Sequence, residues 1–179
     1  ASNPTFDPNS LDYDGDNLIQ DTDAPLLNRV TQGVYRPVST MKIVTTSAIL
    51  ESGIDENYND TGTETIQGYD IKNYGDYEYG PLDLRQAFIY SVNTYFAAKA
   101  DQMGKDSLMA ATDKYMFNKK YDFDLETVGA KIPYDELNQA DLAMTAFGYG
   151  KTQVTPLHMA MIVSSIANDG KMMKPRLVN

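Results

Sequence analysis

Residues 37–53 read PVSTMKIVTTSAILESG and carry the clearest helix signal in the chain. Proline is favoured in the first turn of a helix, and glycine is favoured just past the last turn. Between these two ends, apolar residues occupy much of the helix circumference. The stretch therefore predicts a deeply buried helix from about Pro37 to Ser52, with Gly53 just beyond its end.

Ser39 and Lys42 lie three residues apart in the first turn of this predicted helix. Positions i and i+3 share a helix face, so the hydroxyl and the amine point to the same place. The start of a helix favours negative charge, and a buried lysine can be neutral enough to accept the proton of a serine. The pair therefore suits acyl transfer. The Ser39 backbone N–H could supply one of the two hydrogen-bond donors of an oxyanion hole.

The Ser-x-x-Lys motif is weak evidence when it stands alone. With nine serines and eleven lysines in 179 residues, about half a match is expected by chance, a risk that short motifs share. The alternative interpretation is a serine-capped helix whose lysine reaches solvent.

The rest of the chain divides into helical segments and acidic, loop-like segments. Residues 1–23 and 55–81 are rich in Asp, Asn, Gly and Tyr and predict loops, the second with short β pieces. Further helices are predicted over residues 25–32, 82–103, 105–117, 135–147 and 155–168.

Composition excludes several classes of protein. The chain has no Cys and a single His, so a Cys-ligated zinc site, a Cys nucleophile and a multi-His metal site are excluded. The formal charge of -10, without a basic stripe, argues against nucleic acid as a partner. No apolar run approaches the length of a membrane span.

The negative charge is concentrated in two segments. Residues 1–28 carry six acidic and no basic side chains, and residues 51–83 carry nine acidic and one basic. The remainder, which includes Ser39 and Lys42, carries 10 acidic and 14 basic side chains. A mildly positive remainder is compatible with a substrate that ends in a carboxylate.

A second motif, Ser91-Val92-Asn93, follows about 50 residues after the first, where a helical pattern can break. Ser-x-x-Lys followed by such a Ser-x-Asn triplet is typical of penicillin-recognising enzymes. With these motifs and their flanking runs, the chain resembles the transpeptidase domain of class B penicillin-binding proteins, especially the penicillin-binding protein A-like group. The similar runs lie at residues 3–9, 26–35, 84–97, 148–150, 154–160 and 167–170.

This resemblance implies an α+β fold of the β-lactamase/D,D-peptidase type, an antiparallel sheet flanked by helices. Residues 1–179 are expected to be a partial domain, its mainly helical central portion with few strands, without the flanking sheet strands. The third family motif, Lys-Thr-Gly, is not found: Gly150-Lys151-Thr152 is followed by Gln153 where the motif requires Gly. The chain alone is therefore expected to show little or no transpeptidase activity.

The resemblance also implies the roles of the site residues. Ser39 would be the nucleophile and Lys42 its proton acceptor, Ser91 would relay a proton, and Asn93 would bind the substrate backbone and position Lys42. The expected substrates are peptidoglycan stem peptides and β-lactams, with no cofactor and no metal. The expected location is extracytoplasmic, with a membrane anchor outside this chain and a possible glycosyltransferase partner.

One residue departs from the family pattern. The family usually has Gly directly before the nucleophile, and this chain has Val38. A β-branched side chain restricts the backbone there and could crowd the pocket.

Two other functions stay open at this point. A β-lactam sensor or a β-lactamase-like protein also carries Ser-x-x-Lys. From a different class, a calcium-dependent binding module over residues 12–23 has acidic or amide side chains at calcium-loop positions. Those residues are Asp12, Asp14, Asp16, Gln20 and Asp23. His158 has no partner acid or nucleophile beside it in the sequence and is expected on the surface or in helix packing.

Overall fold

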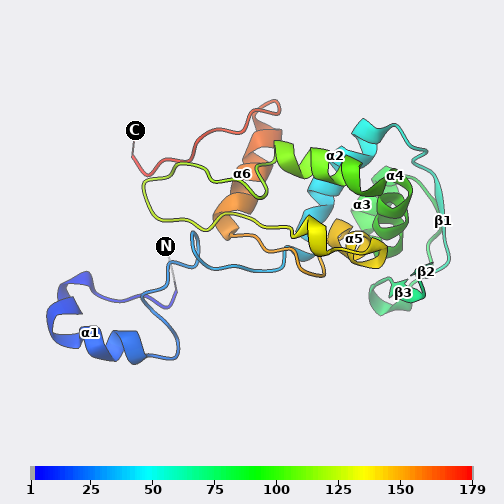
Figure 1. Ribbon diagram of the computed structural model, residues 1–179. Coiled ribbons are helices and arrows are strands. Elements are labelled where there is room, and N and C mark those ends of the chain that lie inside the picture. The colour runs from blue at the N-terminus through cyan, green and yellow to red at the C-terminus, as the bar shows by residue number, and fades with distance from the viewer. Residues whose placement is uncertain (1–2, 179) are drawn as a thin grey trace. The chain divides into compact units, whose positions relative to one another are not determined.

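The structure, a computed structural model, describes residues 3–178 and divides into two compact units (Figure 1). Unit 1 comprises the chain up to Tyr35, Lys120–Ala130 and the chain from Val154 onward. Unit 2 comprises Arg36–Lys119 and Lys131–Gln153. All four predicted site residues lie in unit 2. No helix within the described residues is long and apolar enough to cross a bilayer.

Among the described residues, unit 1 contains the helical elements η1 (Pro8–Ser10), α1 (Leu11–Gln20) and α6 (Pro156–Ala167). Helix α6 confirms the helix predicted over residues 155–168. The side chain of Thr155 accepts a hydrogen bond of 3.2 Å from the backbone N–H of His158, which caps the helix start.

The loop predicted over residues 1–23 is wrong, because Leu11–Gln20 forms helix α1. Asp7 caps the turn before it by accepting a backbone hydrogen bond. Asp12 and Asp14 lie in the first turn, where negative charge favours a helix. None of the residues of α1 is buried, so no apolar stripe marks this helix in the sequence.

Helix α1 also lacks the geometry of the calcium loop considered as an alternative at residues 12–23. Asp12 and Asp16 share one face of a helix, whereas Asp14 lies on the opposite side. Within residues 3–178, no group of three or more His, Cys, Asp or Glu residues is placed to hold a metal ion. The calcium-dependent module therefore has no structural basis in this part of the chain.

The short helix predicted over residues 25–32 is wrong as well, since a series of turns replaces it. The side chain of Asn28 accepts a hydrogen bond of 3.1 Å from the N–H of Val30. The guanidinium of Arg29 donates to the carbonyl oxygen of Ala24 at 3.1 Å. Side chains that bond to nearby backbone groups in this way compete with helix formation.

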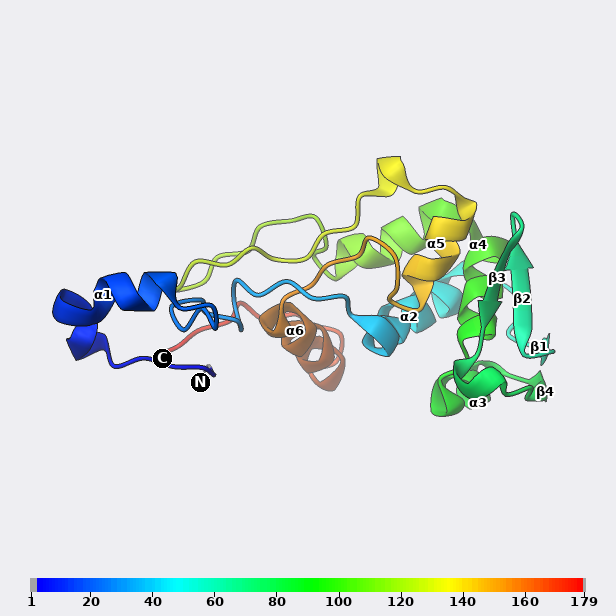
Figure 2. The same ribbon diagram turned by 90° about the horizontal axis from the view of Figure 1, so that it is seen from below.

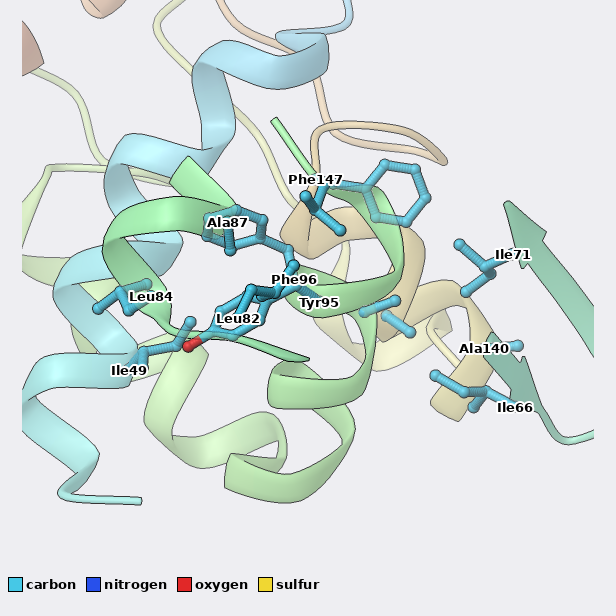
Figure 3. Packing of buried hydrophobic residues seen from close by; sticks show 13 residues of the cluster. Ile49, Ile66, Ile71, Leu82, Leu84, Ala87, Tyr95, Phe96, Ala140 and Phe147 are labelled. Atoms are coloured by element: carbon cyan, nitrogen blue, oxygen red, sulfur yellow. The ribbon is translucent and has the colours of Figure 1, made fainter. Parts of the chain in front are cut away.

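Unit 2 is α+β, with helix α4 at the centre of its packing. Helix α4 packs against α2 and α5 and against strands β2 and β3. A core cluster of buried apolar side chains joins these elements, from Ile49 of α2 through Tyr95 and Phe96 of α4 to Phe147 (Figure 3). The elements are η2 (Val38–Met41), α2 (Lys42–Ser52), β1 (Tyr58–Asp60), β2 (Thr63–Ile66), β3 (Tyr69–Lys72), η3 (Tyr74–Asp76), β4 (Gly80–Leu82), α3 (Leu84–Tyr90), α4 (Asn93–Lys114), η4 (Tyr134–Glu136) and α5 (Gln139–Ala146).

The Asp- and Tyr-rich segment 55–81 forms short strands, as predicted. Strand β1 pairs antiparallel with β4, and β2 pairs antiparallel with β3 (Figure 2). The β2–β3 turn is Gln67-Gly68, and both residues have positive φ, as a two-residue hairpin favours. Ile66 and Ile71 are buried in the core cluster, so this hairpin is fixed against α4 and α5.

The helix predicted over residues 82–103 is interrupted where the Ser-x-Asn motif lies. Helix α3 ends at Ser91, whose φ of 58° and ψ of 46° are left-handed, and α4 starts at Asn93. Helix α4 then continues past Gly104, whose φ of 78° and ψ of 171° produce a kink. The break predicted at Gly104, between residues 82–103 and 105–117, is therefore confirmed, because the backbone is not helical at this residue.

The buried side chain of Lys99 connects helix α4 to the loop after α2 through hydrogen bonds. Lys99 is 4% exposed, and its Nζ donates to the carbonyl oxygens of Asp55 at 2.6 Å and Asn57 at 2.8 Å. We expect Lys99→Met to lower the free energy of unfolding by about 2 kcal/mol, because both carbonyls lose a charged donor. Urea denaturation of the two proteins measures this difference.

Lys114→Met is the matched control on the same helix. The Lys114 side chain is 64% exposed and pairs with Glu51 at 2.9 Å, and exposed pairs of this kind contribute at most about 1 kcal/mol. Equal losses in the two variants would contradict a special role for Lys99.

Candidate active site

Ser39 lies in the 3-10 turn just before the buried helix, which starts at Lys42 and not near Pro37 as the sequence predicts. The turn η2 leads directly into α2, whose first residue is Lys42. Ser39 is exposed, whereas Lys42 is 2% exposed. The helix therefore presents the hydroxyl to solvent and places the amine beneath it.

The amine of Lys42 contacts all three other predicted site residues. Its Nζ lies 3.3 Å from the Oγ of Ser39, 2.9 Å from the Oγ of Ser91 and 2.7 Å from the Oδ1 of Asn93. It also donates to the carbonyl oxygen of Ser91 at 2.7 Å. The Ser91 hydroxyl in turn donates to the Oγ of Ser39 at 3.0 Å, which closes a triangle of polar atoms.

Burial shifts the protonation equilibrium of the Lys42 amine toward the neutral form. Desolvation lowers the pKa of Lys42 from its ordinary value of 10.5 to about 8. The Nζ lies 5.5 Å from the ring centroid of Phe96, which forms part of the apolar surroundings. A fraction of the lysine is consequently neutral near pH 7, and a neutral amine beside a serine hydroxyl can accept its proton.

The break between α3 and α4 brings Ser91 and Asn93 to the lysine. The left-handed backbone of Ser91 turns its carbonyl and its hydroxyl toward Lys42. The amide of Asn93 is oriented by two partners, since its Oδ1 accepts from Lys42 and its Nδ2 donates to the carbonyl oxygen of Lys72 at 3.1 Å. The amide thus connects the lysine to the end of strand β3.

These residues open onto a cleft of about 680 Å³ in unit 2. Tyrosines form much of its wall, and two of them, Tyr79 and Tyr90, stack with ring centroids 5.4 Å apart. Tyr74, Tyr77 and Tyr79 lie in a segment predicted only as loop with short β pieces, although the density of tyrosines in residues 69–79 was the available signal. The lining residues are Val38, Ser39, Asp70, Ile71, Lys72, Asn73, Tyr74, Tyr77, Tyr79, Tyr90, Ser91, Asn93, Met144, Phe147 and Tyr149.

Two other residues considered in the sequence have no part in this arrangement. Lys151, in the Gly-Lys-Thr stretch, is exposed and pairs with the carboxylate of Glu136 at 3.5 Å. His158 belongs to unit 1, where it is fully buried. Its ring packs edge-on against the ring of Tyr121, and the two ring centroids are 5.7 Å apart. Helix packing, one of the two places expected for His158, is the one observed.

Val38, just before Ser39, has a strained backbone. Its φ is +50°, a region that a β-branched residue rarely adopts. Its N–H donates to the carbonyl oxygen of Gly148 at 3.0 Å, and a Cβ on Gly148 would lie 1.8 Å from the Val38 carbonyl oxygen. The close approach of Gly148 leaves the Val38 backbone little room to relax.

We expect Val38→Gly to raise the free energy of unfolding by about 1 kcal/mol, because glycine adopts positive φ without strain. The Val38 side chain is 43% exposed, so little burial is lost. The control is Val128→Gly, at a position that is 56% exposed and is not among the residues with positive φ. Chemical denaturation should show opposite signs for the two variants, and a loss for both would contradict the strain at Val38.

The fold and this four-residue arrangement define the class of protein. The family model of the penicillin binding protein transpeptidase domain matches residues 1–179, and the chain belongs to that family. Among its relatives are the peptidoglycan D,D-transpeptidases PbpA of Mycolicibacterium smegmatis and MrdA of Escherichia coli K12, 31% and 30% identical over 201 residues. These matches cover 99% of this chain, 39% of PbpA and 31% of MrdA.

Solved structures agree with this membership. The imipenem acyl-enzyme complex of penicillin-binding protein A from M. tuberculosis matches with a TM-score of 0.92 and 29% identity, over 98% of this chain and 44% of that chain. The D,D-transpeptidase domain of a peptidoglycan glycosyltransferase from Eggerthella lenta matches with a TM-score of 0.89 and 31% identity, over 98% and 47%. The resemblance and the α+β transpeptidase fold are confirmed, and the described residues are mainly helical with few strands.

Proposed function

We propose that the protein is a peptidoglycan D,D-transpeptidase that works through a serine acyl-enzyme and is acylated by β-lactams. The observation that carries this proposal is the position of the Lys42 amine, buried and within 3.3 Å of both the Ser39 and the Ser91 hydroxyls. The names of the relatives and the acyl-enzyme complexes of penicillin-binding protein A support it.

In the first half of the reaction, Ser39 attacks the carbonyl carbon of the penultimate D-Ala of a stem peptide. Lys42, in its neutral form, takes the proton of the hydroxyl as the Oγ–C bond forms. The Ser39 backbone N–H stabilises the developing oxyanion. The C–N bond then breaks, and the proton passes through the Ser91 hydroxyl to the departing amine of the terminal D-Ala.

In the second half, an amine of a neighbouring stem peptide attacks the acyl-enzyme. A new C–N bond forms, the ester bond to Ser39 breaks, and the serine recovers a proton from the amine through Lys42. Asn93 donates to or accepts from the substrate backbone and keeps the lysine in place. The product is a cross-link between two stem peptides.

The remaining expectations concern the protein as a whole. The chain spans 39% of PbpA, which supports a larger transpeptidase domain in which residues 1–179 are the helical portion. We propose an extracytoplasmic protein held by a membrane anchor outside these residues, with a glycosyltransferase as partner. The extracytoplasmic location suits this chemistry, since the glycan strands whose stem peptides are cross-linked lie outside the cytoplasm.

The proposal is tested by incubating the full gene product that contains this chain with penicillin G. Intact-mass spectrometry should show a mass increase of one penicillin, carried by the peptide that contains Ser39. A protein that gains no mass at millimolar penicillin would overturn the proposal.

The lifetime of the adduct distinguishes the alternative functions. A transpeptidase keeps the acyl group for hours after free penicillin is removed, whereas a β-lactamase-like protein releases it quickly. A β-lactam sensor would also keep the adduct, so cross-linking of purified stem peptides is the deciding assay against a sensor.

A further inference from the structure

A carboxylate with no exposure to solvent lies at the junction of the strands and the active site. Asp60, the last residue of β1, is 0% exposed. Its Oδ1 accepts from the Thr94 hydroxyl at 2.6 Å and from the N–H of Gly62 at 3.1 Å. Its Oδ2 accepts from the Nδ2 of Asn73 and from the N–H of Tyr79, both at 2.9 Å. Four donors therefore converge on one buried carboxylate.

Two of these partners also bond to each other. The Oδ1 of Asn73 accepts from the backbone N–H of Thr94 at 3.2 Å, and its Nδ2 donates to the carbonyl oxygen of Tyr77 at 3.0 Å. Asn73 is 5% exposed and Thr94 is fully buried. The amide oxygen of Asn73 faces a donor and its amide nitrogen faces acceptors, so these partners fix the orientation of the amide.

Asn73 and Thr94 are the chain neighbours of the two groups that meet at the active site. Lys72 precedes Asn73, and its carbonyl oxygen accepts from the Nδ2 of Asn93 at 3.1 Å. Asn93 precedes Thr94, and its Oδ1 accepts from the amine of Lys42 at 2.7 Å. Whatever holds Asn73 and Thr94 together also sets the distance between Lys72 and Asn93.

We propose that Asp60 is a positioning residue for catalysis, acting through Asn93. Its carboxylate joins the end of β3 to the first turn of α4, so that the Asn93 amide presents its oxygen to Lys42 and its nitrogen to Lys72. Asparagine cannot replace it, because all four groups facing Asp60 act as donors and an amide would place an NH2 among them. Nothing in the Ser-x-x-Lys or Ser-x-Asn motifs points to this residue.

The inference rests on the proposed function, because its readout is acylation of Ser39 by penicillin. In the full gene product that contains this chain, we expect Asp60→Asn to slow acylation by about 10- to 100-fold, the cost typical of small misplacements in an active site. Asp55→Asn is the matched control on the same segment, since the Asp55 carboxylate is exposed and its hydrogen bonds are to Asn57. It should acylate at the wild-type rate.

A double-mutant cycle separates positioning from general loss of structure. If Asp60 acts through Asn93, Asp60→Asn should add less than a twofold effect on acylation in an Asn93→Ala background, while it still lowers Tm. Incubation for hours with fluorescent penicillin keeps the slow variants measurable. Equal slowing in both backgrounds would overturn the inference.

A second variant decides the matter if Asp60→Asn does not fold. Thr94→Val removes one donor from Asp60 and leaves three, and it should slow acylation at least threefold, again only when Asn93 is present. Wild-type rates in a folded Asp60→Asn or Thr94→Val protein would overturn the inference and leave the proposed function standing. A wild-type protein that penicillin never labels would overturn the proposed function and this inference with it.

Discussion

Ser39→Ala is expected to abolish labelling by fluorescent penicillin, with a loss of at least ~10³-fold in acylation rate. Removal of a catalytic nucleophile costs at least this much in serine enzymes of known mechanism. Ser39 is exposed, and within residues 3–178 its Oγ bonds to Lys42 and Ser91 alone, so the fold should be unaffected. Gel fluorescence measures the label, and circular dichroism checks the fold.

Ser47→Ala is the matched control, on the helix α2 that follows Ser39. The Ser47 hydroxyl bonds to the Tyr115 hydroxyl at 2.8 Å and donates to the carbonyl oxygen of Ile43 at 3.4 Å. This variant should be labelled as the wild type is. Labelling of Ser39→Ala at more than a few per cent of the wild-type rate would show that another residue is acylated.

The second large effect concerns the charge of Lys42. Because burial lowers its pKa to about 8, the acylation rate should rise as the pH rises through about 8 and the amine becomes neutral. Lys42→Arg should lose at least ~100-fold at every pH, because a guanidinium stays protonated. The rate constant of acylation, measured from pH 6 to pH 10, checks both expectations.

Lys151→Arg is the control for this series. Lys151 belongs to the Gly-Lys-Thr stretch and pairs with Glu136 at the surface, so its replacement should leave the pH profile unchanged. A rate that stays level from pH 6 to pH 10 in the wild type would contradict the role of Lys42 as proton acceptor.

The same pKa shift has a consequence for stability. The folded pKa of about 8 lies below the ordinary value of 10.5, so between these values the unfolded chain binds more protons than the folded one. The contribution of Lys42 to the free energy of unfolding therefore increases with pH from about 8 to 10.5, and below pH 8 the full cost of burying the charge is present. Lys42→Met should remove this pH dependence.

Local signals in the sequence predicted the elements whose ends are set by single residues. Pro37 precedes the turn η2 that leads into the buried helix, Gly53 follows the end of that helix, and Thr155 and Pro156 start the last one. These residues act through their own backbone preferences, which do not depend on the rest of the fold. Segments without such preferences were mispredicted, as with α1, which buries nothing, and residues 25–32, where side chains bond to the backbone instead.

The sequence by itself determined that Ser39 and Lys42 lie on the same face, because side chains three positions apart are neighbours on a helical turn. Tertiary structure decided that Lys42 is buried and that the Ser91–Asn93 turn reaches it across about 50 residues. It also decided the strained φ of Val38, through the close approach of Gly148. Burial, long-range hydrogen bonds and backbone strain depend on what the chain packs against, and no local pattern encodes them.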